Sequence, residues 1–155
     1  VNDISYRSIF RAYILNLKMK KNYIKNSHNK VFIKNKIVYK FFKSHKKYMH
    51  EKYFYMKYHL PHIPKLLCFS DSRRLLVFNN VGTRIKKKNI DFIKLKNIND
   101  NFIKNNIYHN DYRAKNILYN KSNNLYYFID WEYYNYIFTD FRKSPEYDDL
   151  RKELF

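Results

Sequence analysis

The sequence feature that most constrains the fold is a short hairpin flanked by polar residues. Two apolar runs, Ile117 to Tyr119 and Leu125 to Ile129, are separated by the polar stretch Asn120 to Asn124, which predicts a turn between two strands. Paired strands lie about 4.8 Å apart, so the two open ends of a hairpin lie side by side. Asn116 precedes the first run and Asp130 follows the second. The hairpin alone therefore predicts that Asn116 and Asp130 are neighbours.

Asn116 and Asp130 offer the oxygen ligands that Mg²⁺ uses, since Mg²⁺ binds through one or two carboxylates together with substrate phosphates. Phosphoryl transfer also needs a group that orients the attacking hydroxyl. Asp111, in the polar loop before Asn116, is expected to accept or orient that proton. We expect Glu132 to support a second metal. His109 is placed in the catalytic set as a brace for the loop rather than as a base.

The spacing of these residues resembles the catalytic and metal loops of kinases. His109-Asn110-Asp111 is followed by Asn116-Ile117-Leu118 and then by Ile129-Asp130-Trp131-Glu132-Tyr133. This order is most similar to the choline and ethanolamine kinases, within the aminoglycoside-phosphotransferase-like group of the protein-kinase-like superfamily. The resemblance implies an α+β, reduced two-lobed protein-kinase-like fold, with a small antiparallel sheet in the N-lobe and a mainly helical C-lobe. It also implies ATP and Mg²⁺ as cofactors.

A fold of this kind implies a lysine that reaches the nucleotide phosphates and an acid that pairs with the lysine. Residues 37–40 resemble the strand that carries it, so Lys40 is the expected residue. Glu51 is the only acidic residue between positions 4 and 70. It lies in a predicted helix that Ser44 can cap. A surface ion pair between Glu51 and Lys47, four residues apart on that helix, is the competing interpretation.

The order of predicted elements divides one kinase-like domain into two lobes. Residues 1–79 contain an N-terminal helix, antiparallel strands and the helix that carries Glu51. Residues 84–155 contain the catalytic loop and the metal-binding hairpin, and residues 80–83 form a hinge. Two halves of different composition suggest a cleft between them. The backbone groups that the resemblance places against adenine belong to Asn79, Asn80 and Val81.

The loop that would cover the ATP phosphates departs from the family pattern. The stretch Ser27 to Phe32 resembles the end of that loop in choline kinases, which makes Ser27 and Asn29 expected ATP contacts. The glycines that precede it in the family are absent, and Lys25 and Asn26 stand there instead. Glycine normally lets backbone amides approach phosphate closely. A catalytically weak or inactive kinase-like binding protein is therefore an alternative to an active kinase.

The formal net charge of +19 raises a third interpretation, a basic nucleic-acid-associated module. Lysines are scattered through most segments, whereas a nucleic-acid interface needs them on one face. Lys, Asn, Ile, Tyr and Phe are abundant, and their codons are rich in A and T. Genome composition is thus a competing cause of the charge.

The acceptor that the resemblance implies is a small-molecule alcohol of the choline, ethanolamine or aminoglycoside kind. A quaternary ammonium needs an aromatic cage or acidic groups. No run of about 18 apolar residues is present, so we expect no membrane span. The single Cys68 excludes an internal disulfide and favours a reducing, cytoplasmic setting. The aromatic residues placed to build a cage, or alternatively to belong to the core, are Trp131, Tyr133, Tyr134 and Tyr136.

Overall fold

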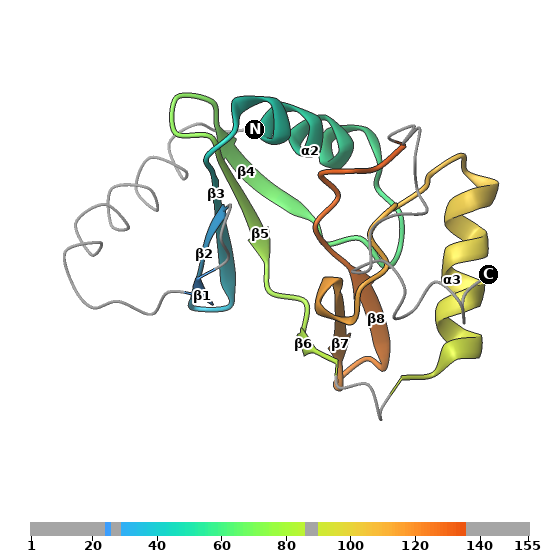
Figure 1. Cartoon of the computed structure of the whole chain (residues 1–155). Helices are drawn as coiled ribbons and strands as arrows, with labels where there is room; N and C mark the ends of the chain where they lie inside the picture. The colour runs from blue at the N-terminus through green and yellow to red at the C-terminus, as the bar shows by residue number, and fades with distance from the viewer. Residues whose placement is uncertain (1–23, 26–28, 86–89, 136–155) are drawn as a thin grey trace.

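The computed structural model describes residues 24–25, 29–85 and 90–135. The helix predicted near the N-terminus, Ser27 and Tyr136 lie outside the described residues. The described chain forms a five-stranded antiparallel sheet with helix α2, followed by a three-stranded antiparallel sheet with helix α3 (Figure 1). This is the α+β arrangement that the sequence predicts.

The five-stranded sheet contains the antiparallel strands predicted for residues 1–79, and they include two hairpins. Its strand order is β1-β2-β3-β5-β4. The turn between β2 and β3 consists of Asn35 and Lys36, whose φ angles of 50° and 60° are those of a tight type I′ hairpin turn. The strands are β1 (Ile24–Lys25), β2 (Asn29–Lys34), β3 (Ile37–Phe42), β4 (Leu66–Ser70) and β5 (Leu75–Asn79).

Helix α2 (His45–Lys57) begins where the sequence predicts, because the Ser44 hydroxyl accepts a hydrogen bond from the Lys47 N–H at 3.4 Å. The helix lies across the top of the sheet in Figure 1. Its buried residues are Tyr48, Glu51, Phe54 and Tyr55. The ring of Phe54 stacks on the ring of Trp131 with centroids 4.2 Å apart. One face of α2 therefore directs Glu51 toward the end of the hairpin that precedes Asp130.

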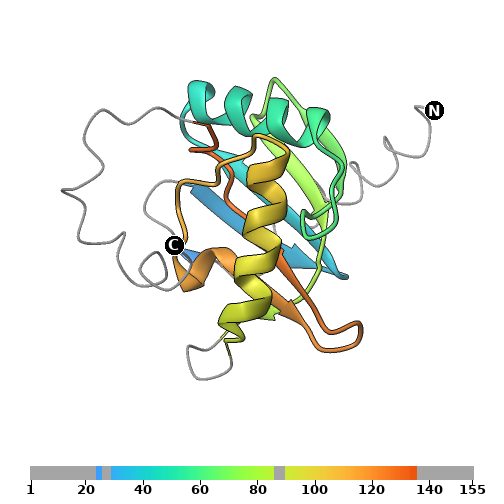
Figure 2. The same ribbon diagram turned by 90° about the vertical axis from the view of Figure 1, so that its right-hand side faces the viewer.

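The three-stranded sheet contains the hairpin predicted for residues 117–129 and one strand that the sequence did not predict. The hairpin strands are β7 (Ile117–Asn120) and β8 (Leu125–Phe128), and β6 (Thr83–Arg84) pairs with β7. Helix α3 (Phe92–Lys104) lies between β6 and β7 in the sequence. Figure 2 shows α3 in front of β7 and β8. The Phe102 ring on α3 meets the rings of Phe128 and Trp131 at 5.3 Å each.

The two sheets share one hydrophobic core. A single cluster of buried residues includes Phe54 of α2, Phe78 of β5, Leu95 of α3 and Phe128 of β8. The segment between α2 and β4 also docks on β8, because the Phe128 N–H donates to the His62 carbonyl at 2.8 Å. The relative position of the sheets, and of the site between them, is thus held by packing as well as by the connector. The hinge boundary at residues 80–83 stays a prediction.

The only glycine of the chain, Gly82, lies in that connector. A Cβ at position 82 would lie 2.4 Å from the carbonyl oxygen of Tyr119 and 2.7 Å from its carbonyl carbon. Both atoms belong to the backbone of β7, so they cannot move aside as a side chain can. The absence of a side chain at Gly82 allows the connector to pass directly against β7.

Changing Gly82 to Ala is expected to lower the free energy of unfolding by about 1–3 kcal/mol, because the new methyl group overpacks against the β7 backbone. Urea unfolding measures this. Ser72→Ala, in the exposed turn between β4 and β5, is the control and should change stability by less than about 0.5 kcal/mol. Equal stability of the two variants would show that the connector shifts freely.

Among the described residues, no helix has both the length and the apolar character needed to cross a bilayer.

Candidate active site

A cavity of about 370 Å³ contains most of the residues that the sequence singled out. It is lined by residues of β2, β3, α2 and β5 on one side and by residues around β7 and β8 on the other. His109, Asp111 and Asn80 do not line it, and Ser27 lies outside the described residues. The predicted site residues that do line it are Asn29, Lys40, Glu51, Asn79, Val81, Asn116, Asp130 and Glu132.

Lys40 forms the centre of a buried charge cluster. Its ammonium lies 2.7 and 3.0 Å from the two carboxylate oxygens of Glu51 and 2.6 Å from Oδ1 of Asp130. Glu51 is only 1% exposed. The competing interpretation, a surface pair between Glu51 and Lys47, is wrong, because Lys47 turns toward Glu132 and Tyr133 instead. The predicted pairing of Lys40 with Glu51 is present.

Burial and charge oppose each other in this cluster. Burial lowers the pKa of Lys40, but the charges of Asp130 and Glu51 outweigh it and raise that pKa above its usual value. Burial, opposed by Lys40 and reinforced by Asp130, raises the pKa of Glu51 to about 7. Burial also acts on Asp130, but Lys40 outweighs it and keeps the pKa of Asp130 below its usual value. The Lys40 ammonium thus pairs with both carboxylates, and it stabilises the ionised form of Asp130 more than that of Glu51.

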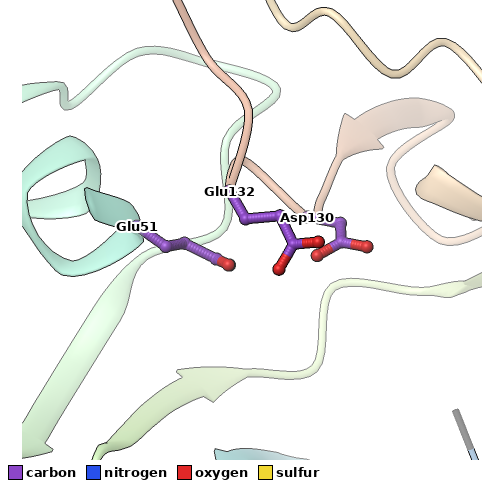
Figure 3. A group of neighbouring side chains, drawn as sticks. All are labelled: Glu51, Asp130 and Glu132. Carbon is purple, nitrogen blue, oxygen red and sulfur yellow. The ribbon is translucent and has the colours of Figure 1, made fainter. Parts of the chain in front are cut away.

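Three carboxylates converge on one point of the cavity. Oxygens of Glu51, Asp130 and Glu132 lie within 4.8 Å of one another (Figure 3). Asp130 has a φ of 68°, a left-handed conformation that only a few residue types adopt readily. Ile129 donates its N–H to the Asn116 carbonyl at 2.9 Å, so the hairpin brings Asn116 beside Asp130 as predicted. A set of carboxylate oxygens at this spacing fits a hard divalent cation such as Mg²⁺.

His109 braces the catalytic loop. Its Nδ1 accepts a hydrogen bond from the Asp111 N–H at 3.2 Å, and its Nε2–H donates to the Ile129 carbonyl at 2.8 Å. The ring is fully buried, and burial lowers the pKa of His109 below its usual value. Protonation at Nδ1 would break the bond to Asp111. This geometry agrees with the expectation that His109 holds the loop and does not act as a base.

The lowered pKa of His109 makes stability depend on pH. The unfolded chain binds a proton at this histidine at a higher pH than the folded chain does, so the contribution is present above pH 6.5 and is lost as pH falls below it. We expect the contribution of His109, taken as the difference in unfolding free energy between wild type and His109→Gln, to fall by up to about 1.4 kcal/mol per pH unit between pH 6.5 and 5. Glu51, whose pKa is raised, acts in the opposite sense in both proteins. Urea unfolding across this range measures the slope. His109→Gln should flatten it, whereas His59→Gln, at an exposed position, should keep it.

Asp111 is held by a residue that sequence reasoning missed. The Arg113 guanidinium contacts both carboxylate oxygens of Asp111, and the Asn116 side-chain amide donates to the Asp111 carbonyl at 3.1 Å. Arg113 lines the cavity, whereas Asp111 lies behind Arg113, does not line the cavity and is 4% exposed. The position of Arg113, two residues after Asp111 in the same loop, was the only signal in the sequence.

Hydrogen bonds within the protein already engage some groups of the residues that were expected to contact adenine. Asn80 donates its N–H to the Lys36 carbonyl at 2.8 Å, so this N–H is not available to adenine. The side chain of Asn79 accepts from the Lys65 N–H at 3.1 Å. Of the three expected residues, Asn79 and Val81 reach the cavity. The assignment of Asn80 to the adenine site stays a prediction.

Glu132 joins three segments, which the sequence did not predict. Its carboxylate accepts from Lys47 of α2 at 3.0 Å and from the Asn29 side chain of β2 at 3.4 Å. His50 of α2 donates to the Glu132 carbonyl at 3.0 Å. Burial lowers the pKa of Lys47, but its hydrogen bonds to Tyr133 and Glu132 outweigh it and raise the pKa above its usual value. Glu132 therefore ties α2 and β2 to the segment that follows β8.

The aromatic residues expected to form a substrate cage belong mainly to the core. Trp131 is fully buried and Tyr134 is 6% exposed. The Tyr134 ring stacks on His50 with centroids 4.4 Å apart. Tyr133 is the only one of the four expected residues that lines the cavity among the residues that the structure describes. The core interpretation therefore holds for Trp131 and Tyr134.

The overall arrangement is similar to that of a solved kinase structure. No protein-family model matches this sequence, and no curated protein sequence does either. The structure of the Cydia pomonella granulovirus kinase PK-1 matches with a TM-score of 0.54 and 22% sequence identity. The match covers 83% of this chain and 59% of the viral kinase. At this identity the match shows the fold alone, and the chain has a reduced kinase-like α+β fold.

Proposed function

We propose that this chain is an ATP- and Mg²⁺-dependent phosphotransferase that acts on a hydroxyl of a small molecule. The observation that carries the proposal is the convergence of three carboxylates within 4.8 Å beside the Lys40 ammonium, in a cavity of a kinase-like fold. Charge on a transferring phosphoryl group must be neutralised, and a lysine together with metal-binding carboxylates supplies that neutralisation.

Each residue then has a distinct role. Asp130 and Asn116 hold Mg²⁺, and Glu132 is a further metal ligand. Lys40 contacts the phosphates and is itself held by Glu51. Bound Mg²⁺ would neutralise charge on the phosphates. Hydrogen bonds to adenine would come from the backbone near Val81.

Asp111 orients the acceptor hydroxyl in this proposal. Its carboxylate does not line the cavity and is paired with Arg113, so the Arg113 side chain must move before a hydroxyl in the cavity can reach Asp111. Because Arg113 lines the cavity, its guanidinium can contact the phosphoryl group while that group is transferred. The His109 brace keeps the Asp111 backbone in place during this exchange.

The sequence resemblance implies an amino alcohol of the choline, ethanolamine or aminoglycoside kind, but we propose only that the acceptor is a small molecule with a hydroxyl, used in the cytoplasm where ATP is abundant. The hydroxyl is the part of this proposal that Asp111 supports. The described residues give the amine no open aromatic cage, because Trp131 and Tyr134 are buried.

Purified protein with ATP and a panel of small alcohols tests the proposal. We expect phosphorylated product that requires Mg²⁺ and disappears in Asp111→Asn. A panel of neutral, anionic and cationic alcohols without any product, in the presence of measurable ATP binding, would reject the transferase activity.

A kinase-like binding protein with little or no turnover is the second candidate. Two observations favour it: the phosphate-covering segment lacks glycine, and Arg113 already engages both oxygens of Asp111. Calorimetric titration with ATP and Mg²⁺ would then show binding, while product formation stays at the level of Asp111→Asn. Robust turnover would exclude this candidate.

A further inference from the structure

The cavity contains a place that is suited to an alkylammonium group. Proteins hold such groups with an aromatic ring and a nearby carboxylate. Three aromatic residues line the cavity among the described residues, and two of them, Tyr55 and Phe78, are 3% and 5% exposed. The third, Tyr133, is half-buried and follows Glu132 directly. Glu132 and Tyr133 together therefore provide a ring and a carboxylate at one wall of the cavity.

The ammonium of Lys47 already occupies this place. Its Nζ lies 3.0 Å from Oε1 of Glu132 and 2.9 Å from the hydroxyl oxygen of Tyr133. It also lies 4.9 Å from the centroid of the Tyr133 ring. An amino alcohol with a primary ammonium would need the same contacts, and the trimethylammonium group of choline would need the same ring and carboxylate without the hydrogen bonds.

The remaining carboxylates at the cavity also face protein cations. Glu51 and Asp130 share the ammonium of Lys40, and Asp111 behind the wall is held by Arg113. Each acidic group that the structure describes at or next to the cavity thus has a cation of the protein beside it.

Two more cations face the same space. Arg84 and Lys115 line the cavity and are exposed. Neither forms a salt bridge with another of the described residues. A second positive charge entering this space would meet like charges, which disfavours it.

We propose that Lys47 determines acceptor specificity: its ammonium fills the site formed by Glu132 and Tyr133 and excludes alcohols that carry a positive charge. The natural acceptor is then a neutral or anionic alcohol. The consequence for the acceptor rests on the proposed phosphotransferase function, whereas the occupied ammonium site can be tested by binding without ATP.

The test compares choline with 3,3-dimethylbutan-1-ol, which has the same shape without the charge. Calorimetric titration of the full chain is expected to show that the wild type binds the neutral alcohol at least about tenfold more tightly than choline. Lys47→Ala opens the site, and its Kd for choline and for tetramethylammonium should fall at least about tenfold, the effect of one ring-and-carboxylate contact. Lys46→Ala, at the neighbouring exposed position of α2, is the matched control and should behave as the wild type does.

Further variants separate an ammonium site from a structural tie between α2 and the segment after β8. Adding Glu132→Gln to Lys47→Ala should abolish the gained choline binding, which loss of a structural tie alone would not predict. The wild-type comparison of the two alcohols remains decisive if Lys47→Ala does not fold. Equal binding of both alcohols by the wild type, or no gain of choline binding in folded Lys47→Ala, overturns the proposal. Absence of phosphotransfer would count against the proposed function alone.

Discussion

Changing Asp130 to Asn is expected to lower phosphotransfer by roughly 10³-fold while the fold is retained. Asn keeps the shape of the side chain but removes the charge that would bind metal. It also tolerates the left-handed backbone at this position, where φ is 68°. Lys40 keeps its contacts to Glu51, at 2.7 and 3.0 Å. Steady-state phosphorylation with varied Mg²⁺ measures the loss, and circular dichroism measures the fold.

Asp100→Asn is the matched control for this variant. Asp100 lies on α3, has a side chain that is 43% exposed and pairs only loosely with Lys96, at 3.5 Å. The Asp100→Asn variant should retain full activity. If Asp130→Asn kept more than about a tenth of the wild-type rate, a preorganised charge at Asp130 would not be part of the reaction.

Changing Lys40 to Met is expected to lower the free energy of unfolding by about 3–5 kcal/mol and to abolish activity. Met has a similar length but leaves Glu51, which is 1% exposed, without its cation. Burial already raises the pKa of Glu51 to about 7 in the wild type, and removal of Lys40 raises it further. The stability that a raised carboxyl pKa contributes is present at low pH and is lost as pH rises through the folded-state pKa. The penalty should therefore be larger at pH 8 than at pH 5.

The double variant Lys40→Met with Glu51→Gln distinguishes the two effects of Lys40. It removes the buried uncompensated charge, so most of the lost stability should return, while phosphotransfer should remain absent. Lys96→Met is the control, because its exposed pair with Asp100 is worth only about 0.5 kcal/mol. Urea unfolding at both pH values measures all three proteins. A Lys40→Met variant as stable as Lys96→Met at pH 8 would contradict the buried pair.

The parts of the site that the sequence predicted depend on short-range geometry. Asn116 and Asp130 are neighbours because a four-residue turn reverses the chain between their strands. Glu51 could be assigned because no other acid lies near it in the sequence, and Ser44 marks the start of its helix. The role of each residue in the reaction remains a prediction that the variants above test.

The parts that only the tertiary structure decided depend on which side chains meet across the fold. Lys47 lies four residues before Glu51 on α2, yet it pairs with Glu132, which is 85 residues away in the sequence. Backbone groups of residues 79–81 were expected at adenine, but the Asn80 N–H donates to the carbonyl of Lys36 in the β2–β3 turn. Periodicity and turn signals report local backbone states, and they carry no information about such partners.

The hairpin by itself thus determined that an oxygen-rich centre forms beside Asp130. Packing of α2 and β3 against the end of that hairpin decided the rest, because it brings Lys40 of β3 and Glu51 of α2 to Asp130 and Glu132. It also places Lys47 of α2 beside Tyr133. The physical reason is that hydrogen-bonded neighbours in a hairpin are set by chain geometry, whereas pairs between lobes are set by burial of the shared core around Phe54 and Trp131.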